Sequence, residues 1–220
     1  RVVDPLGRPV DGLGEILTLA GVALLATGVL AACSNSTSNS SNSSSSGADQ
    51  AFNYIYEVDP ENLNYLISSK AATTDLTANL IDGLLENDNY GNLVPSMAED
   101  WTVSKDGLTY TYKLRKDAKW YTSDGEEYAD VKAQDFVAGL KYAADNKSET
   151  LYLVQSSIKG LDDYVNGKTK DFSSVGVKAV DDRTVQYTLN EPESFWNSKT
   201  TMGILYPVNE EFLKSKGDKF

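Results

Sequence analysis

The chain has no histidine and a single cysteine, Cys33, among its 220 residues. Without histidine it cannot build a Ser-His-Asp or Cys-His catalytic site or a histidine zinc site, and one cysteine allows no internal disulfide. Basic residues are also scarce, because 20 Lys and Arg stand against 32 Asp and Glu, which gives a net charge of −12. Phosphate contacts need basic patches, so this balance argues against a nucleic-acid partner. We expect the chain not to be an enzyme.

The plentiful acidic residues show no recognisable site. No pair of carboxylates stands in a motif that marks a general acid and base. The stretch 86–91 resembles a calcium loop weakly, but Tyr90 occupies a position where a ligand oxygen is required. We therefore predict no metal ion and no other cofactor.

One long apolar run, residues 16–32, ends in small residues directly before the cysteine. The end of the run, Leu30-Ala31-Ala32-Cys33, resembles the lipobox of bacterial lipoproteins, in which the peptidase cleaves before the cysteine and its thiol is joined to diacylglycerol. The resemblance implies a signal-peptide hydrophobic region at 16–32 and lipid attachment at Cys33. The alternatives are a short transmembrane anchor or a buried helix, although the run is shorter than the roughly 20 residues of a membrane span.

The segments on either side of this run have unusual compositions. Residues 1–15 lack an initial Met and carry acidic residues where a signal peptide has a basic start, so we interpret them as a non-native leader. Residues 34–46 are all Ser, Thr or Asn, and they offer no apolar surface to offset the entropy of ordering a backbone. We predict a tether over 33–47 and a folded part over 48–220.

Alternation of apolar and polar residues predicts two antiparallel hairpins in a mixed α/β fold. Residues 108–115 alternate as a half-buried strand, and a turn at 105–107 joins them to a partner strand around 101–103. The second hairpin covers 175–189, with its turn at 181–183. The alternation directs three tyrosines toward a core rather than toward a stacking ligand: Tyr110, Tyr112 and Tyr187.

Apolar residues at helical spacing predict three helices. The first begins at an Asp75 cap and buries a face made of Leu76, Leu80, Ile81, Leu84 and Leu85. The second covers 133–145. Asn209 can cap the third, which runs through Phe212 and Leu213 to the end of the chain.

Several motifs occur in the order and at the spacing of one protein family. They are Leu93-Val-Pro-Ser-Met-Ala-Glu-Asp-Trp101, the strand and turn from Asp106 to Trp120, Ser123-Asp-Gly-Glu126, Ala133-Gln-Asp-Phe136 and Val175-Gly-Val-Lys-Ala-Val-Asp-Asp182. Through them, nearly all of residues 50–220 resemble the solute-binding proteins of peptide-importing ABC transporters (family 5). The closer resemblance is to streptococcal oligopeptide-binding lipoproteins. Lys132 departs from the pattern, because the family commonly has Ser or Thr there, so the cap of the 133–145 helix must come from elsewhere.

The resemblance implies a two-lobed α/β fold of the periplasmic-binding-protein type (type II), with an enlarged first lobe. Family members are considerably longer, so residues 48–220 would contain the first strand, 52–56, and most of the extra subdomain, and would stop before the second lobe. The implied function is capture of short peptides for an ABC importer at the outer face of the bacterial cytoplasmic membrane. The implied partners are permease subunits and, through acylated Cys33, membrane lipid. The alternatives are a surface adhesin, a signalling-peptide receptor without a transport role, or a truncated, non-functional gene product.

Two parts of the sequence are candidates for the peptide site under this resemblance. The segment Lys70-Ala71-Ala72-Thr73-Thr74 occupies the place of a family loop that contacts peptide backbone, and its small residues would let the main chain approach a ligand. Tyr152 aligns with a family tyrosine near the cleft. The structural alternatives are a plain connecting loop and a partly buried core tyrosine.

Overall fold

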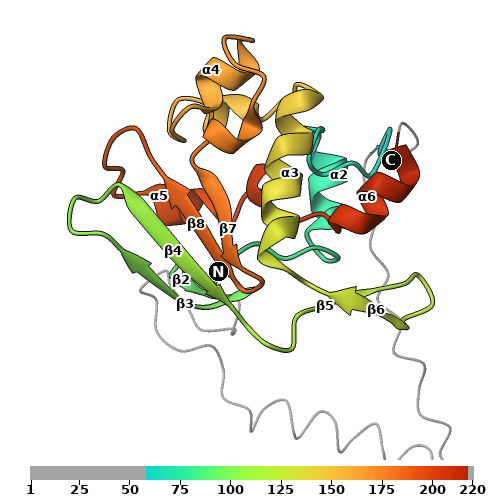
Figure 1. Cartoon of the computed structure of the whole chain (residues 1–220). Coiled ribbons are helices and arrows are strands. Elements are labelled where there is room, and N and C mark those ends of the chain that lie inside the picture. The colour runs from blue at the N-terminus through green and yellow to red at the C-terminus, as the bar shows by residue number, and fades with distance from the viewer. Residues whose placement is uncertain (1–57, 218–220) are drawn as a thin grey trace, which may run out of the picture. The chain divides into compact units, whose positions relative to one another are not determined.

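The structure, a computed structural model, describes residues 58–217, and its main feature is a four-stranded antiparallel sheet in the order β3-β4-β8-β7 (Figure 1). The strands are β3 (Ala98–Val103), β4 (Thr109–Leu114), β7 (Val177–Asp181) and β8 (Thr184–Thr188). β3 with β4 and β7 with β8 form the two predicted hairpins, which are confirmed. The pairing of β4 with β8 joins the hairpins into one sheet.

Short polar turns close both hairpins. In the β3–β4 turn the Asp106 carboxylate accepts the Leu108 N–H at 3.1 Å, and Gly107 takes a φ of 72° that glycine adopts without strain. In the β7–β8 turn Asp181 Oδ1 accepts the Arg183 N–H at 2.8 Å. These local bonds fix the register in which the apolar side chains of each pair face the same side.

The buried face of the sheet is built from aromatic side chains. Tyr110, Tyr112 and Tyr187 are all buried, so their predicted place in the core is confirmed. They surround Trp196, the first residue of α5 (Trp196–Lys199), and the ring centroids of Tyr187 and Trp196 lie 5.4 Å apart. The Tyr112 hydroxyl donates to Asn197 Oδ1 at 2.6 Å, which satisfies a polar group inside the core.

Helix α3 (Ala133–Asp145) has the predicted bounds and packs along β7 and β8. Its apolar face buries Phe136 and Leu140 completely. Gly139 faces the segment after α5, where an added β-carbon would lie 2.5 Å from the Tyr206 carbonyl oxygen. Only glycine permits the backbones to approach so closely.

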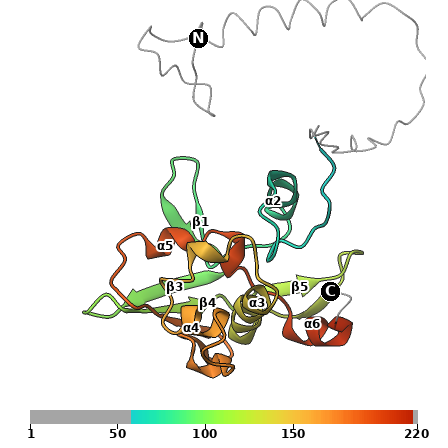
Figure 2. The ribbon, with the colours of Figure 1, turned by 90° about the horizontal axis from the view of Figure 1, so that it is seen from above.

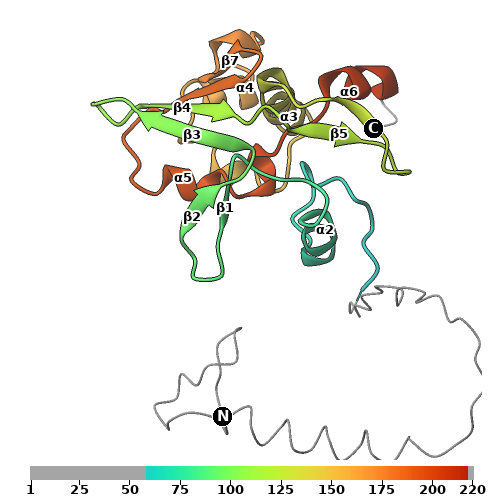
Figure 3. The same ribbon diagram turned by 90° about the horizontal axis from the view of Figure 1, so that it is seen from below.

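The predicted helix over residues 75–85 is wrong. Helix α2 begins earlier and covers only Ala71–Thr77, and the chain then becomes extended and enters β1 (Leu85–Asn87), which pairs with β2 (Leu93–Pro95). Leu84 is fully buried in this extended segment, and its carbonyl oxygen accepts the Ala98 N–H at 2.9 Å. Of the five apolar residues taken for a helix face, only Leu84 and Leu85 are buried in the core, and they reach it from beyond the end of α2, whereas Leu80 is exposed. Figures 2 and 3 show α2 and the β1–β2 hairpin on one side of the domain, away from α4 (Leu161–Val165).

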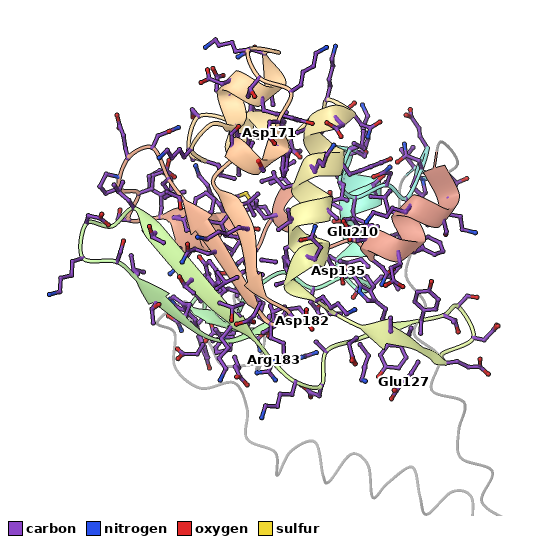
Figure 4. All side chains as sticks on the ribbon, viewed as in Figure 1. Glu127, Asp135, Asp171, Asp182, Arg183 and Glu210 are labelled. Carbon is purple, nitrogen blue, oxygen red and sulfur yellow. The ribbon has the colours of Figure 1, made fainter. Side chains whose placement is uncertain are left out.

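Helix α6 (Glu210–Lys216) starts at the predicted Asn209 cap, whose side chain accepts the Phe212 N–H at 2.8 Å. Beside it lies the buried Asp135 of α3, and Figure 4 shows Asp135 and Glu210 close together. Asp135 Oδ1 accepts the Glu210 N–H at 3.1 Å, and Oδ2 accepts the Lys132 N–H at 3.0 Å. Asp135 thus supplies the α3 cap that Lys132 does not, and it ties α3 to α6.

The remaining elements are short: β5 (Lys119–Tyr121), β6 (Glu127–Asp130), and the 3-10 turns η2 (Leu151–Leu153), η3 (Phe172–Ser174) and η4 (Gly203–Leu205). Among residues 58–217, no helix is long and apolar enough to cross a membrane. Several predictions lie outside the described residues: the leader, the 16–32 run, Cys33, the tether and the strand at 52–56.

Candidate functional site

The candidate segment before β1 is not a loop. Lys70 is the N-cap of α2, and Ala71, Ala72, Thr73 and Thr74 form its first turns, so the loop interpretation of this segment is wrong. Within this helix the Thr74 hydroxyl donates to the Lys70 carbonyl of the preceding turn at 3.2 Å. Lys70, Ala71 and Thr74 are exposed, and Ala72 is half-buried.

Thr73 differs from its neighbours because its side chain lies in the core, with 1% of its surface exposed. Its hydroxyl donates to the Asn62 carbonyl at 2.8 Å and accepts from the Ser68 hydroxyl at 3.4 Å. Within the predicted segment, Thr73 therefore anchors the start of α2, while the exposed surface belongs to the residues around it.

Tyr152, in η2, is 72% exposed, so the alternative of a core tyrosine is wrong. Its ring is open to solvent and does not line the hollow described below. The link between the two regions is Glu149, whose Oε2 accepts the Ser69 N–H at 2.9 Å and the Ser69 hydroxyl at 2.7 Å. The structure thus brings together the two candidate regions, which lie about eighty residues apart in the sequence.

A hollow of about 260 Å³ lies between these regions. Its wall contains Thr74 and Thr77 from α2, Thr150 and Leu153 beside Tyr152, and residues of the segment that leads to α6. No charged side chain lines it, as its lining shows: Tyr65, Ser68, Thr74, Thr77, Ala78, Thr150, Leu153, Thr201, Met202, Gly203, Ile204 and Tyr206.

The hydroxyl groups in this wall are bonded to the protein itself. Tyr65 donates to the Pro207 carbonyl at 2.6 Å, Tyr206 to the Thr201 carbonyl at 3.0 Å, and Thr77 to the Thr73 carbonyl at 2.8 Å. Burial raises the pKa of the Tyr65 hydroxyl well above its ordinary value, so it stays neutral. The hollow therefore presents an uncharged and mostly apolar surface.

A second hollow, of about 520 Å³, lies between the β5–β6 hairpin and α6. Its aromatic wall includes Tyr121 and Tyr128, which are 59% and 51% exposed, and Tyr128 meets the ring of Phe212 edge-on at 6.4 Å. No residue predicted for the peptide site lies here. The first hollow is therefore the candidate functional site.

The described residues contain no group of three or more Asp, Glu, His or Cys side chains placed to hold a metal ion. The acidic stretch at 86–91 forms the β1–β2 turn, where Asp88 Oδ1 accepts the N–H groups of Tyr90 and Asn92 at 2.8 and 2.9 Å. The Asn92 side-chain amide also donates to Asp88 Oδ2 at 3.0 Å. This side-chain bond has the largest effect, and together with the backbone bonds it lowers the pKa of the Asp88 carboxyl. This carboxylate closes a turn.

Sequence reasoning missed Ser69, Glu149, Tyr65 and Tyr206. No motif marks them, because each acts through a partner far away in the chain or through a backbone carbonyl that any residue could supply. The only available signal was the placement of hydroxyl residues around the predicted segment.

The fold defines a class of protein, since solved structures of oligopeptide-binding proteins share it. "Listeria monocytogenes OppA bound to peptide" matches 72% of this chain and 30% of that one at a TM-score of 0.64 and 32% identity. The complex of Haemophilus influenzae OppA with the peptide RPPGFSPFR matches 73% of this chain and 31% of that one at a TM-score of 0.65 and 29% identity. The chain has the α/β fold of periplasmic peptide-binding proteins.

The model of the bacterial extracellular solute-binding proteins, family 5 Middle, matches residues 92–220. The chain therefore belongs to this family, and the predicted resemblance is confirmed. It is 98% identical to the oligopeptide-binding protein SarA of Streptococcus gordonii over 94% of its length, and 71% identical to AliA of Streptococcus pneumoniae over the same share. It spans 31% and 30% of the length of those two proteins.

Proposed function

We propose that the chain serves in an exported protein that captures short peptides and passes them to an ABC importer. The observation that carries this proposal is the 98% identity to a protein named as oligopeptide-binding. The solved relatives with bound peptide give further support. The similar proteins are solute-binding proteins, so we propose binding rather than catalysis. None of these similarities favours the alternative of an adhesin.

The peptide would bind on the surface shared by α2 and η2. The exposed residues Lys70 and Ala71, at the start of α2, would meet the peptide, and Tyr152 would cover one peptide residue with its ring. The hollow beside them would take one side chain. Because its wall has no charge and its hydroxyls already have acceptors, an apolar side chain would enter more readily than a charged one.

The remaining parts of the sequence fit this role as proposals. Residues 16–32 would direct export, and Cys33 would carry the lipid that holds the protein at the outer face of the cytoplasmic membrane. Residues 33–47 would tether residues 48–220, which would form the start of the first lobe and its extra subdomain, and permease subunits would receive the peptide. Native mass spectrometry of protein extracted from its own membrane tests the anchor and the ligand in one spectrum. A chain with neither acylation at Cys33 nor bound peptide would contradict both.

The peptide site is best tested in a chimera that joins residues 1–220 to the remainder of SarA. The change Tyr152→Ala should weaken peptide binding about five- to tenfold, because an exposed aromatic contact would be lost. Tyr121→Ala is the matched control, since Tyr121 is similarly exposed but lies in the other hollow. Isothermal titration should also show that a peptide with Leu at one position binds more tightly than the same peptide with Glu or Lys. Equal affinities for both variants and for all three peptides would refute this placement.

A further inference from the structure

Three hydrogen bonds fasten the segment before α2 to residue 149. The Ser69 N–H and the Ser69 hydroxyl both donate to Glu149 Oε2, at 2.9 and 2.7 Å, and the Glu149 N–H donates to the Ile67 carbonyl at 3.0 Å. The contact includes main-chain groups on both sides. It therefore fixes the path of the backbone and not merely the position of one side chain.

The fastened segment lies where the backbone changes direction. Lys70 has an extended conformation, with φ −73° and ψ 132°, and the next residue already belongs to α2. The Lys70 N–H donates to Ser68 Oγ at 3.2 Å, and Thr73 holds the first turn of the helix from inside. Glu149 restrains the extended side of this bend, directly before the exposed residues that are proposed to meet the peptide.

The same glutamate precedes the other half of the site. Thr150 lines the hollow and Tyr152 stands two residues further on, in η2. Because the Glu149 side chain accepts from Ser69 and the Glu149 backbone donates to Ile67, the segment before Lys70 and the start of the segment that carries Tyr152 are held in one arrangement. Loss of the contact would let the two surfaces move independently. Peptide binding would then have to order them, and the entropic cost of this ordering would lower the affinity.

The charge of Glu149 strengthens the contact. Hydrogen bonds from the Ser69 hydroxyl and the Ser69 N–H, and then the nearby charge of Lys70, lower the pKa of the Glu149 carboxyl. A carboxylate accepts such bonds more strongly than a neutral group does. Because the pKa of Glu149 is lower in the folded state, the contact contributes its full stabilisation at pH values above the ordinary glutamate pKa. This stabilisation is lost as the pH falls through the lowered pKa.

From this geometry we infer that Glu149 is a positioning residue of the peptide site, acting through Ser69 on the main chain at Lys70. This inference rests on the proposed function. It adds a residue that touches no peptide and yet sets the affinity.

The test uses the SarA chimera and titrates one peptide into Glu149→Ala, Ser69→Ala and the double variant. Each single change should weaken binding about three- to tenfold at neutral pH while the thermal midpoint stays close to that of the parent protein. The double variant should bind no more weakly than Glu149→Ala, because Glu149→Ala already removes both bonds that Ser69 donates, including the one that Ser69→Ala removes. Glu126→Ala, which removes an exposed glutamate from the β5–β6 turn, is the matched control and should bind like the parent.

A pH series separates positioning from a general structural role. The affinity of the parent protein should fall in acid as Glu149 takes up a proton, and Glu149→Gln should lack this part of the profile while it binds better than Glu149→Ala, because the amide keeps an acceptor oxygen. Unchanged affinity in the Glu149 variants, with Tyr152→Ala still weakened, would overturn the positioning role and leave the proposed function standing. A parent chimera that binds no peptide would overturn both.

Discussion

Replacing Asp135 should destabilise the domain more than any other single carboxylate change in the described residues. Its side chain is 4% exposed and accepts three N–H groups: Trp120 Nε1 at 2.8 Å, the Lys132 backbone at 3.0 Å and the Glu210 backbone at 3.1 Å. These donors belong to β5, to the start of α3 and to the start of α6. One carboxylate therefore joins three elements that converge from distant parts of the chain.

The expected loss for Asp135→Ala is about 3 kcal/mol. Each lost hydrogen bond is taken to contribute roughly 1 kcal/mol net to the free energy of unfolding, which is less than the usual value for a bond to a charged group. The lower figure applies because the donors are only partly buried and can bond to water once the carboxylate is removed. Typical domains have unfolding free energies of about 5–15 kcal/mol, so the variant should unfold at clearly lower urea concentration. Trp120 loses its acceptor, and its fluorescence follows the change. Asp124→Asn, in the exposed β5–β6 turn, is the control. A loss below about 1 kcal/mol would refute the account of three shared bonds.

The pH dependence gives this prediction a second check. Burial, as the largest cause, raises the pKa of Asp135 in spite of its hydrogen bonds. The folded state then holds the proton more tightly than the unfolded chain, so stability from this group is present below about pH 4 and is lost as the pH rises through the raised pKa. The stability difference between the parent protein and Asp135→Asn should therefore be larger near pH 4 than at pH 7. A difference that grows with pH would mean that the hydrogen bonds outweigh burial.

Two further predictions concern packing and ligand capture. Gly139→Ala should lower the unfolding free energy by about 1–3 kcal/mol, because the new methyl group would clash with the Tyr206 carbonyl oxygen. Urea denaturation measures this loss of stability. A stabilised variant would contradict the close approach of α3 to this segment. The isolated segment 48–220 should bind peptides only weakly, since it would hold only part of the proposed two-lobed site and would leave the ligand exposed to water. Micromolar or tighter binding in a calorimetric titration would refute the need for a second lobe.

The hairpins and α3 could be predicted from the sequence because their signals are local. Alternation along 108–115 sets which side chains face the core, and the Asp-Gly and Asp-Asp turns close the pairs. The bounds of α3 follow from helical spacing over thirteen residues, and the Asn209 cap needs only the amide three positions later. In each case the interacting groups lie within one strand pair or a few helical turns.

The region from Lys70 to Leu85 could not be predicted in this way. The spacing of the leucines at 76, 80, 84 and 85 is compatible with one continuous helix, and it is equally compatible with a short helix followed by a strand. Packing decided between them, because Gly83 lies against the Thr200 carbonyl oxygen and the Leu84 carbonyl accepts the N–H groups of Ser96 and of Ala98 at the start of β3. Both partners come from other parts of the fold, which a local pattern does not contain.

The sequence by itself determined the fold class and the family, because these depend on residue types at fixed spacing, and it predicted the two parts of the candidate site. Tertiary structure alone decided that the halves meet, that Thr73 faces inward while Tyr152 faces solvent, and that the hollow between them carries no charge. The physical reason is that burial and hydrogen-bond partners are set by contacts between residues remote in the chain. The bond from Ser69 to Glu149 is one such contact.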